Sequence, residues 1–244
     1  MSEAIASVTT DREEDYLKAI YILAHGQATP LAPGLLVERL GVSSAAVSRM
    51  LQRLDRSGLV RHVAYQGVTL TEAGRRHALR VLRHHRLVEY FLVERLGYDW
   101  AYVDESVDRL EHAIDEELAG RLEAMLGHPP ACPHGDPIPS AALEMPQIVE
   151  RPLNTLAVGQ RAEISRVMGD AATLTYLREE QLVPGTSLTV TERSARGGLL
   201  TIERDGERLL LPPMIAAAIF VRRPTSTEAA DSRAHHGAVQ SVPL

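Results

Sequence analysis

The chain has 244 residues, of which 45% are hydrophobic and 24% charged, and this length and composition fit a globular protein of two or three small domains. It contains no run of 18 apolar residues and no basic segment leading into an apolar one, so neither a membrane span nor a secretion signal is predicted. Its single cysteine, Cys132, excludes an internal disulfide framework and fits a cytoplasmic protein.

The charge is segregated along the chain. The net charge of −6 would by itself argue against a nucleic-acid-binding protein. Residues 44–62, however, carry four arginines and one aspartate, whereas residues 104–124 carry eight acidic residues and two arginines. The first segment can therefore approach phosphate, and the second suits cations.

The first 75 residues predict a winged helix-turn-helix. A helix capped at Thr10 and stopped near Gly26 precedes a short helix over 35–40, which Gly41 ends. A second short helix follows Ser43 and stops at residues 57–58, and two β-rich runs, 59–63 and 68–70, are separated by a turn that ends in Gly67. The second short helix places three arginines on one face, opposite its apolar residues: Arg49, Arg53 and Arg56.

The rest of the chain predicts a helical region, a linker and a β-rich domain. One helix ends at Leu96, and another is predicted from about Val103 to Leu126, with an apolar stripe typical of a dimer interface or a bundle core. Residues 127–155 are rich in proline and glycine and predict a linker. Five β-rich runs between 159 and 221, with a short helix over 171–182 after the first of them, predict a small barrel-like domain. The tail from Pro224 is polar and predicted to be disordered.

Acidic residues run beside the apolar stripe, displaced from it by one position. Asp104, Asp108, Glu111 and Asp115 have helical spacing, and His112 follows Glu111. On the preceding helix His85 and Glu89 are four residues apart and therefore reach one point. Two carboxylates 4 Å apart repel by ~4 kcal/mol at an effective dielectric of about 20, so a cluster favours a compensating cation. The pattern predicts a divalent-metal site, although such acids are commonly only solvated.

Five blocks of sequence then give a specific resemblance. They are EDYLKAIY over 14–21, GVSSAAVS over 41–48, HRLVE over 85–89, LEH over 110–112 and PHGDPIP over 133–139. In this order they resemble the diphtheria-toxin-repressor family of dimeric, metal-activated bacterial repressors. The resemblance implies a mainly α fold with small β parts. Its domains are a winged helix over 1–75, a helical dimerisation and metal-binding domain over 76–145, a linker over 146–154, an SH3-like (FeoA-type) barrel over 155–223 and a tail over 224–244.

The same resemblance implies two metal sites. The first combines Asp15, Asp108, Glu111 and His112; the second combines His85, Glu89 and Asp104, with Asp170 from the barrel. Iron-responsive members carry methionine and cysteine where this chain has Asp15 and Asp108, and hard carboxylates in place of sulfur favour Mn²⁺, as in the manganese-transport regulators. Lys18 stands where the short manganese regulators have a metal-binding glutamate, which argues against a closely bridged two-metal cluster.

The predicted mechanism is metal-dependent binding of double-stranded operator DNA by a homodimer. A metal that joins the first helix to the dimer domain would fix the spacing of two recognition helices, so that half-sites about 34 Å apart become readable. We expect phosphate contacts from Ser43, Ser44 and Ser48, a base contact from Arg49, and backbone contacts from Arg53 and Arg56.

Three alternatives compete with a manganese-dependent repressor of metal-uptake genes. The first is an Fe²⁺ sensor of the same fold. The second is a metallohydrolase, which is disfavoured because no separate nucleophile or general base accompanies the predicted ligands. The third is a metal-free winged-helix regulator. The prediction is therefore a regulator rather than an enzyme, with no membrane partner and no small organic substrate.

Overall fold

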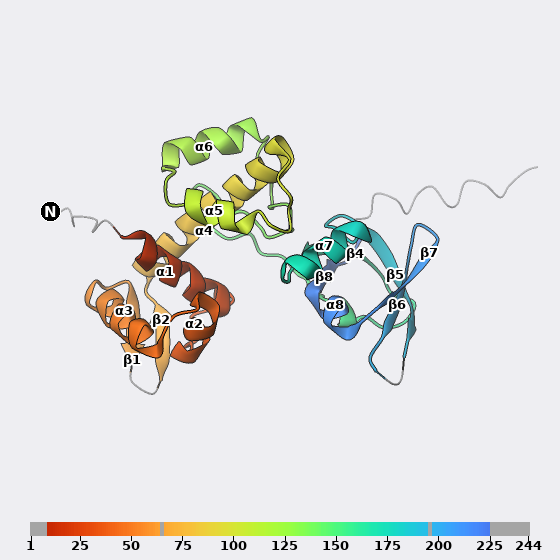
Figure 1. The fold of residues 1–244 in the computed structure, drawn as a ribbon, viewed down its shortest axis with the longest axis horizontal. Coiled ribbons are helices and arrows are strands. Elements are labelled where there is room, and N and C mark those ends of the chain that lie inside the picture. The colour runs from red at the N-terminus through yellow and green to blue at the C-terminus, as the bar shows by residue number, and fades with distance from the viewer. Residues whose placement is uncertain (1–8, 64–65, 195–196, 225–244) are drawn as a thin grey trace, which may run out of the picture. The chain divides into compact units, whose positions relative to one another are not determined.

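The computed structural model describes residues 9–63, 66–194 and 197–224. The chain divides into two compact units, 1–147 and 148–244 (Figure 1). Among the described residues, no helix combines the length and the apolar composition that crossing a membrane requires. The predicted tail lies outside the described residues from 225 onwards.

The first unit begins with the predicted winged helix-turn-helix. α1 (Asp11–Leu23) starts at Thr10, which forms a capping box with Glu13. α2 (Pro33–Leu40) ends at Gly41, whose φ of 63° is the left-handed conformation that glycine adopts without strain. α3 (Ser44–Arg56) is capped by Ser43, and β1 (Val60–Val63) pairs antiparallel with β2 (Gly67–Leu70). The elements predicted for this region are confirmed.

A single apolar core joins these elements to the long helix that follows. Leu17 and Ile20 of α1, Leu36 of α2 and Leu51 of α3 are fully or almost fully buried together. α4 (Glu72–Leu96) contributes Leu79 to the same core, and it begins at Thr71 and ends at Gly97. Burial of each such side chain contributes about 1.5–3 kcal/mol relative to its exposure to water. α4 therefore fixes α1, and with it the winged helix, to the remaining helices of the first unit.

The single helix predicted over 103–126 is wrong. The structure has α5 (Asp104–Leu110), a turn over 111–113, and α6 (Glu116–Met125). Asp115 caps α6 by accepting a hydrogen bond from the Leu118 amide, which favours a new helix start over continuation. The apolar stripe is broken accordingly: Val103 and Val107 pack against α4, while Leu110 and Leu118 are exposed within the chain.

Residues 129–139 are also more ordered than a linker. Ile138 lies in a core cluster with Leu87 of α4 and Ala119 of α6. The guanidinium of Arg83, on α4, is almost completely buried; it donates to the Pro139 carbonyl and pairs with Glu123 of α6. Arg86 donates to the Pro137 carbonyl. The proline- and glycine-rich composition reflects irregular backbone that packs onto α4, because arginines satisfy its carbonyls.

The second unit is the predicted small barrel-like domain. Its six-stranded antiparallel sheet has the order β3-β8-β4-β5-β6-β7. The elements are β3 (Arg151–Pro152), a 3₁₀ turn (Leu153–Thr155), β4 (Arg161–Val167), α7 (Ala171–Glu179), β5 (Ser187–Arg193), β6 (Leu200–Arg204), β7 (Glu207–Leu211), α8 (Pro213–Ala218) and β8 (Ile219–Arg222). Asp205 and Gly206, both at positive φ, form the predicted hairpin turn. Residues 213–218 are helical, so only the end of the 215–221 run is a strand.

The junction between the wing and α4 leaves no room for a side chain at Gly74. A Cβ built there would lie 1.9 Å from the carbonyl oxygen of Leu59, whereas a Cβ at Gly120 of α6 would meet nothing within 4 Å. We expect Gly74→Ala to lower the free energy of unfolding by about 3 kcal/mol through overpacking. Gly120→Ala should raise it by about 0.5–1 kcal/mol because alanine is the better helix former. Urea denaturation followed by circular dichroism measures both; a Gly74→Ala protein as stable as the wild type would contradict this packing.

Candidate metal centre

Side chains with metal-ligating atoms gather in three groups among the described residues of the first unit. One consists of Asp15, Glu111 and His112, and a second consists of His85, Asp108 and Glu111. These two groups share Glu111, and we call their five residues the Glu111 centre. The third consists of Glu89, Cys132 and His134, which we call the buried group. Within each group the ligand atoms lie within 4.8 Å of one another.

The end of α5 positions the Glu111 centre. Neighbouring residues of a helix point about 100° apart, so Glu111 and His112 would diverge if the helix continued. Because α5 ends at Leu110 and the chain turns, Glu111 Oε1 and His112 Nε2 instead lie 3.2 Å apart. The His112 ring also reaches α1, where its Nε2 lies 3.0 Å from Asp15 Oδ1. The second Glu111 oxygen lies 2.5 Å from His85 Nδ1 on α4.

Lys18 supplies a cation to the same carboxylates. Its Nζ lies 2.5 Å from Glu111 Oε1 and 3.1 Å from Asp108 Oδ1. Burial alone would lower the pKa of Lys18, but the Glu111 and Asp108 carboxylates outweigh it and the net shift is upward. Glu111 is only 1% exposed, so a protein cation offsets part of its desolvation. Lys18 is also the only lysine in the whole sequence.

His112 carries the second compensating charge. Its hydrogen bonds to Asp15 and to Glu14 raise the pKa of His112 to about 10. When His112 is protonated, its Nε2–H lies between the carboxylates of Asp15 and Glu111. A divalent cation that displaced this proton would find two hard carboxylate oxygens and an imidazole, a donor set that suits Mn²⁺ or Fe²⁺. The residues present therefore fit a metal ion.

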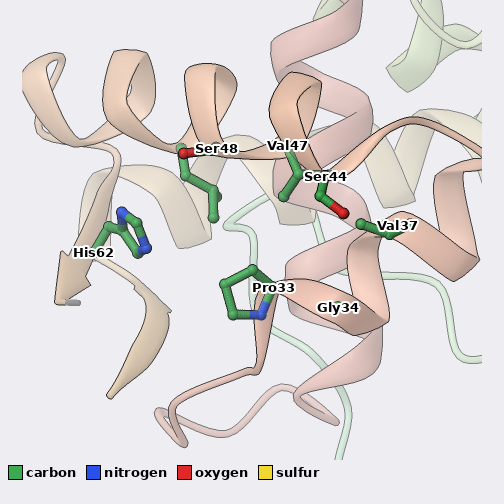
Figure 2. Close-up of a pocket in the computed structure, with 8 residues that line it drawn as sticks. Pro33, Gly34, Val37, Ser44, Val47, Ser48 and His62 are labelled. Atoms are coloured by element: carbon green, nitrogen blue, oxygen red, sulfur yellow. The ribbon is translucent and has the colours of Figure 1, made fainter. Parts of the chain in front are cut away.

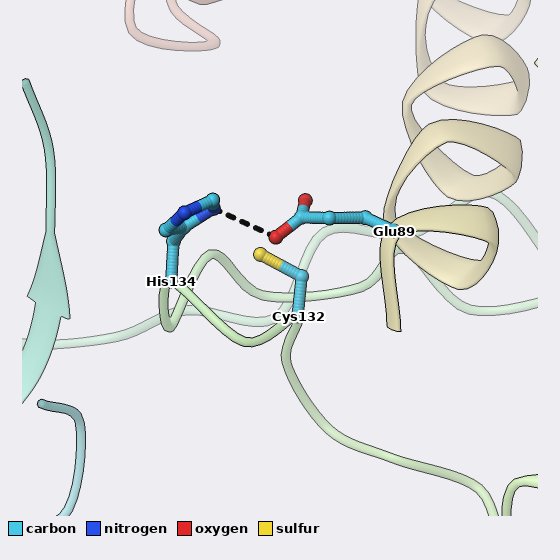
Figure 3. A group of neighbouring side chains, drawn as sticks. All are labelled: Glu89, Cys132 and His134. Atoms are coloured by element: carbon cyan, nitrogen blue, oxygen red, sulfur yellow. Dashed lines mark ion pairs between the residues drawn. The ribbon is translucent and has the colours of Figure 1, made fainter. Parts of the chain in front are cut away.

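The buried group lies between α4 and the loop over 129–139. In Figure 3 the Glu89 carboxylate, the Cys132 sulfur and the His134 ring point toward one another. His134 Nδ1 is 2.7 Å from Glu89 Oε1, and its Nε2 is 3.0 Å from the carbonyl oxygen of Trp100, on which the ring also stacks. When Nε2–H donates to Trp100, Nδ1 is left as the metal-binding nitrogen, so a carboxylate, a thiol and an imidazole are available.

The net pKa shift differs between Cys132 and Glu89 of the buried group, although burial acts in the same direction on both. Burial raises the pKa of Cys132 well above its ordinary value, and the nearby Glu89 carboxylate adds to the effect. It would raise the pKa of Glu89 too, but the contact with His134 outweighs it and the net shift is downward. A metal ion would have to displace the thiol proton, which it does more readily when it is thiophilic.

The structure divides the predicted ligands differently from the sequence. Of the first predicted site, Asp15, Glu111 and His112 come together and Asp108 lies in the adjoining group. Of the second, His85 joins Glu111 whereas Glu89 joins the buried group, and Asp104 belongs to none of the three groups. Asp170, in the second unit, is exposed; its carboxylate caps α7 by accepting a hydrogen bond from the Thr173 amide.

Sequence reasoning missed Cys132 and His134 as candidate ligands. Both lie in or beside the PHGDPIP block, which was used only as evidence of resemblance. Short tracts that combine cysteine and histidine are a compositional signal for metal binding. Their partner Glu89 is more than 40 positions away, and only the packing of the loop onto α4 joins them.

The predicted DNA-contacting residues lie at the solvent face of α3. Ser43, Ser44, Ser48, Arg49, Arg53 and Arg56 are all exposed. Beside them, α2, α3 and β1 line a pocket of about 130 Å³, with Ser44, Ser48 and His62 at its edge (Figure 2). Arg53 also pairs with Glu13 of α1 at 2.7 Å, so this guanidinium links the recognition helix to the helix that carries Asp15.

Comparison with known proteins agrees with this architecture. Residues 8–68 match the family described as "Iron dependent repressor, N-terminal DNA binding domain", residues 71–140 its "metal binding and dimerisation domain", and residues 151–223 the FeoA domain. The iron-dependent repressor IdeR of Mycobacterium tuberculosis is 33% identical over 87% of this chain and 97% of its own length. The diphtheria toxin repressor of Corynebacterium diphtheriae is 29% identical over 86% of the chain and 96% of its own length.

Among solved structures, a manganese-dependent transcriptional repressor in complex with manganese superposes with a TM-score of 0.80. It is 35% identical and is matched over its whole length and 87% of this chain. The chain therefore belongs to the iron-dependent (diphtheria-toxin) repressor family of metal-dependent transcription repressors. Members of this family bind DNA and are not enzymes, so the predicted fold class and function class are confirmed.

The raised pKa of His112 predicts how the stability of the metal-free protein varies with pH. His112 has a pKa of about 10 against an ordinary value of 6.5, so its contribution is fully present below pH 6.5 and is lost as the pH rises toward 10. In chelator, the stability difference between the wild type and His112→Gln should therefore shrink between pH 6.5 and pH 10. Thermal unfolding at a series of pH values measures it. His128→Gln, at an exposed histidine, is the control; a wild-type advantage that grew with pH would reverse the assignment.

Proposed function

We propose that this chain is a manganese-dependent repressor in which a metal ion at the Glu111 centre joins the winged helix to the helical region. The observation that carries the proposal is that Asp15 of α1 and Glu111 and His112 beyond α5 converge on one point. A cation held by ligands from both parts stabilises the arrangement in which they meet. Its preference for that arrangement is sufficient to couple metal binding to DNA binding.

The choice of Mn²⁺ rests on the chemistry of the donors. Asp15 and Glu111 offer hard carboxylate oxygens and His112 offers an imidazole, with no sulfur within the Glu111 centre. Such sites suit Mn²⁺, and Fe²⁺ is the alternative that the same donors accept. The structural relative that its title names as a manganese complex supports the first choice, and the mycobacterial iron-dependent repressor keeps the second open.

We infer that the buried group is a second metal site, formed by Glu89, Cys132 and His134. Its thiol is a softer ligand than any in the Glu111 centre, so it should hold thiophilic ions such as Zn²⁺ more tightly than Mn²⁺. Asp104 and Asp170, which are both exposed, remain predicted ligands. His85 is assigned to the Glu111 centre instead.

We propose that DNA binding uses the exposed face of α3 in a homodimer. Ser43, Ser44 and Ser48 would contact phosphates, Arg49 a base edge, and Arg53 and Arg56 the backbone. The division of the first unit at residue 75 and a cytoplasmic location remain predictions. The division is consistent with the boundary at 68–71 between the two repressor-domain matches.

The function predicts that Asp15 is required for metal-dependent DNA binding. A duplex selected from a random pool with Mn²⁺ present should bind the wild type about 10–100-fold more tightly with Mn²⁺ than with chelator. Asp15→Ala should remove most of this dependence, because α1 loses its ligand. Fluorescence anisotropy with labelled duplex measures the Kd.

Glu105→Ala is the matched control, since it removes an exposed carboxylate from α5 that belongs to no ligand group. Equal binding with Mn²⁺ and chelator in the wild type would contradict the proposal as a whole. Activation by Fe²⁺ at lower free concentrations than Mn²⁺ would overturn only the choice of metal.

The position of Lys18 predicts that the Glu111 centre takes one ion rather than two. Its ammonium sits between Asp108 and Glu111, where a second ion would need those oxygens. Lys18→Met should destabilise the metal-free protein by about 3 kcal/mol, since a buried carboxylate loses its partner. It should also tighten Mn²⁺ binding by about tenfold or more, because like charges about 4 Å apart repel by ~4 kcal/mol at an effective dielectric of about 20.

Denaturation in chelator and isothermal titration with Mn²⁺ measure these opposite effects. Arg121→Met, which removes an exposed cation from α6, should change neither quantity appreciably. A Lys18→Met protein that bound Mn²⁺ more weakly than the wild type would show that Lys18 assists the metal instead of competing with it.

A further inference from the structure

Glu14 precedes the ligand Asp15 but faces a different set of partners. It is largely buried, and three side chains converge on its carboxylate. Thr9 Oγ1 donates to Oε1 at 2.8 Å, Arg80 Nη2 of α4 donates to the same oxygen at 2.6 Å, and His112 Nδ1 lies 2.8 Å from Oε2. Glu14 belongs to none of the three ligand groups.

The two nitrogens of the His112 ring are therefore used for different purposes. Nδ1 faces Glu14, whereas Nε2 faces Asp15 and Glu111. A neutral imidazole binds a metal through the nitrogen that carries no proton, and the partner of the other nitrogen decides which one that is. A carboxylate that accepts a hydrogen bond from Nδ1–H leaves the Nε2 lone pair directed at the other ligands.

Glu14 is suited to accept that hydrogen bond. Thr9 Oγ1 and Arg80 Nη2 both donate to its Oε1, which leaves Oε2 to accept from His112 Nδ1. The carboxylate is thus an acceptor only, and Arg80 fixes its direction from α4. Glu14 of α1 and Arg80 of α4 therefore hold the His112 ring in place in the metal-free protein.

We propose that Glu14 is a positioning residue of the metal centre, which holds His112 by Nδ1 so that Nε2 is presented to the metal, and that Arg80 in turn orients Glu14. The proposal rests on the proposed metal binding at the Glu111 centre and adds a residue that touches no metal. Its consequence is that metal affinity depends on α4, through Arg80, as well as on the ligands themselves.

Glu14→Gln tests the proposal with little change in shape. Isothermal titration with Mn²⁺ should show affinity at the Glu111 centre weakened by about 10–100-fold, the range found for partners of metal-bound histidines. In a His112→Ala background the same substitution should have no further effect on Mn²⁺ binding, because the ring through which Glu14 acts is absent. Titration of His112→Ala alone gives the Mn²⁺ binding that remains without this ring.

A spectroscopic measurement separates positioning from simple stabilisation. With Zn²⁺ as a diamagnetic probe, ¹⁵N NMR of the His112 ring should show protonated Nδ1 and metal-bound Nε2 in the wild type. Glu14→Gln should weaken or mix this tautomer. Glu123→Gln is the matched control, since it also removes a carboxylate paired with an α4 arginine, Arg83, yet it should leave Mn²⁺ affinity unchanged.

Wild-type Mn²⁺ affinity in Glu14→Gln, or an equal loss in Glu123→Gln, would overturn the proposal. If Glu14→Gln does not fold, Arg80→Gln keeps the carboxylate and removes only its orienting partner; it should weaken Mn²⁺ binding in the same direction and by less, and unchanged affinity there would also overturn it. Failure of the metal-binding function itself is distinguishable, because the wild type and His112→Ala would then bind Mn²⁺ alike.

Discussion

The first unit is organised around the need of one buried carboxylate for positive charge. Glu111 is removed from water at the point where α5 ends, and a carboxylate in such a place is costly unless cations face it. Lys18 from α1 and the neighbouring His112 do so, and the ring of His85 from α4 lies 2.5 Å from the second Glu111 oxygen. Because these partners come from three segments, satisfying one charge also holds those segments together.

This arrangement explains why a metal ion can act as an effector here. A proton on His112 and the ammonium of Lys18 join α1 to the end of α5 with two single charges. A divalent ion at the same place would bring more charge and would thus favour the joined state more strongly. α1 also contacts the recognition helix α3, because Glu13 pairs with Arg53. The next residue of α1, Glu14, contacts His112 of the Glu111 centre, so one helix touches both the DNA-binding helix and the metal centre.

The Glu111 centre and the buried group differ in the chemistry they offer. The Glu111 centre is made of carboxylates and imidazoles and borders solvent through Asp15 and Asp108, whereas all three residues of the buried group are shielded and one is a thiol. Different ions would therefore compete differently for the two places. The loop over 129–139 matters to this division, since it brings Cys132 and His134 to Glu89, whereas His85, one helical turn earlier on α4, contacts Glu111.

The sequence by itself determined the winged helix, the long helix α4 and the strand-rich second unit, because caps, glycine stops and apolar periodicity are local signals. It also identified Asp15, Glu111 and His112 through the resemblance that their blocks carry. Only the tertiary structure decided that the chain turns after Leu110, that Glu89 pairs with Cys132 and His134, and that Lys18 and Glu14 serve the same centre. The turn has a local cap at Asp115, but the other two facts depend on contacts between residues 40 to almost 100 positions apart, and no local pattern encodes which distant residues a turn brings together.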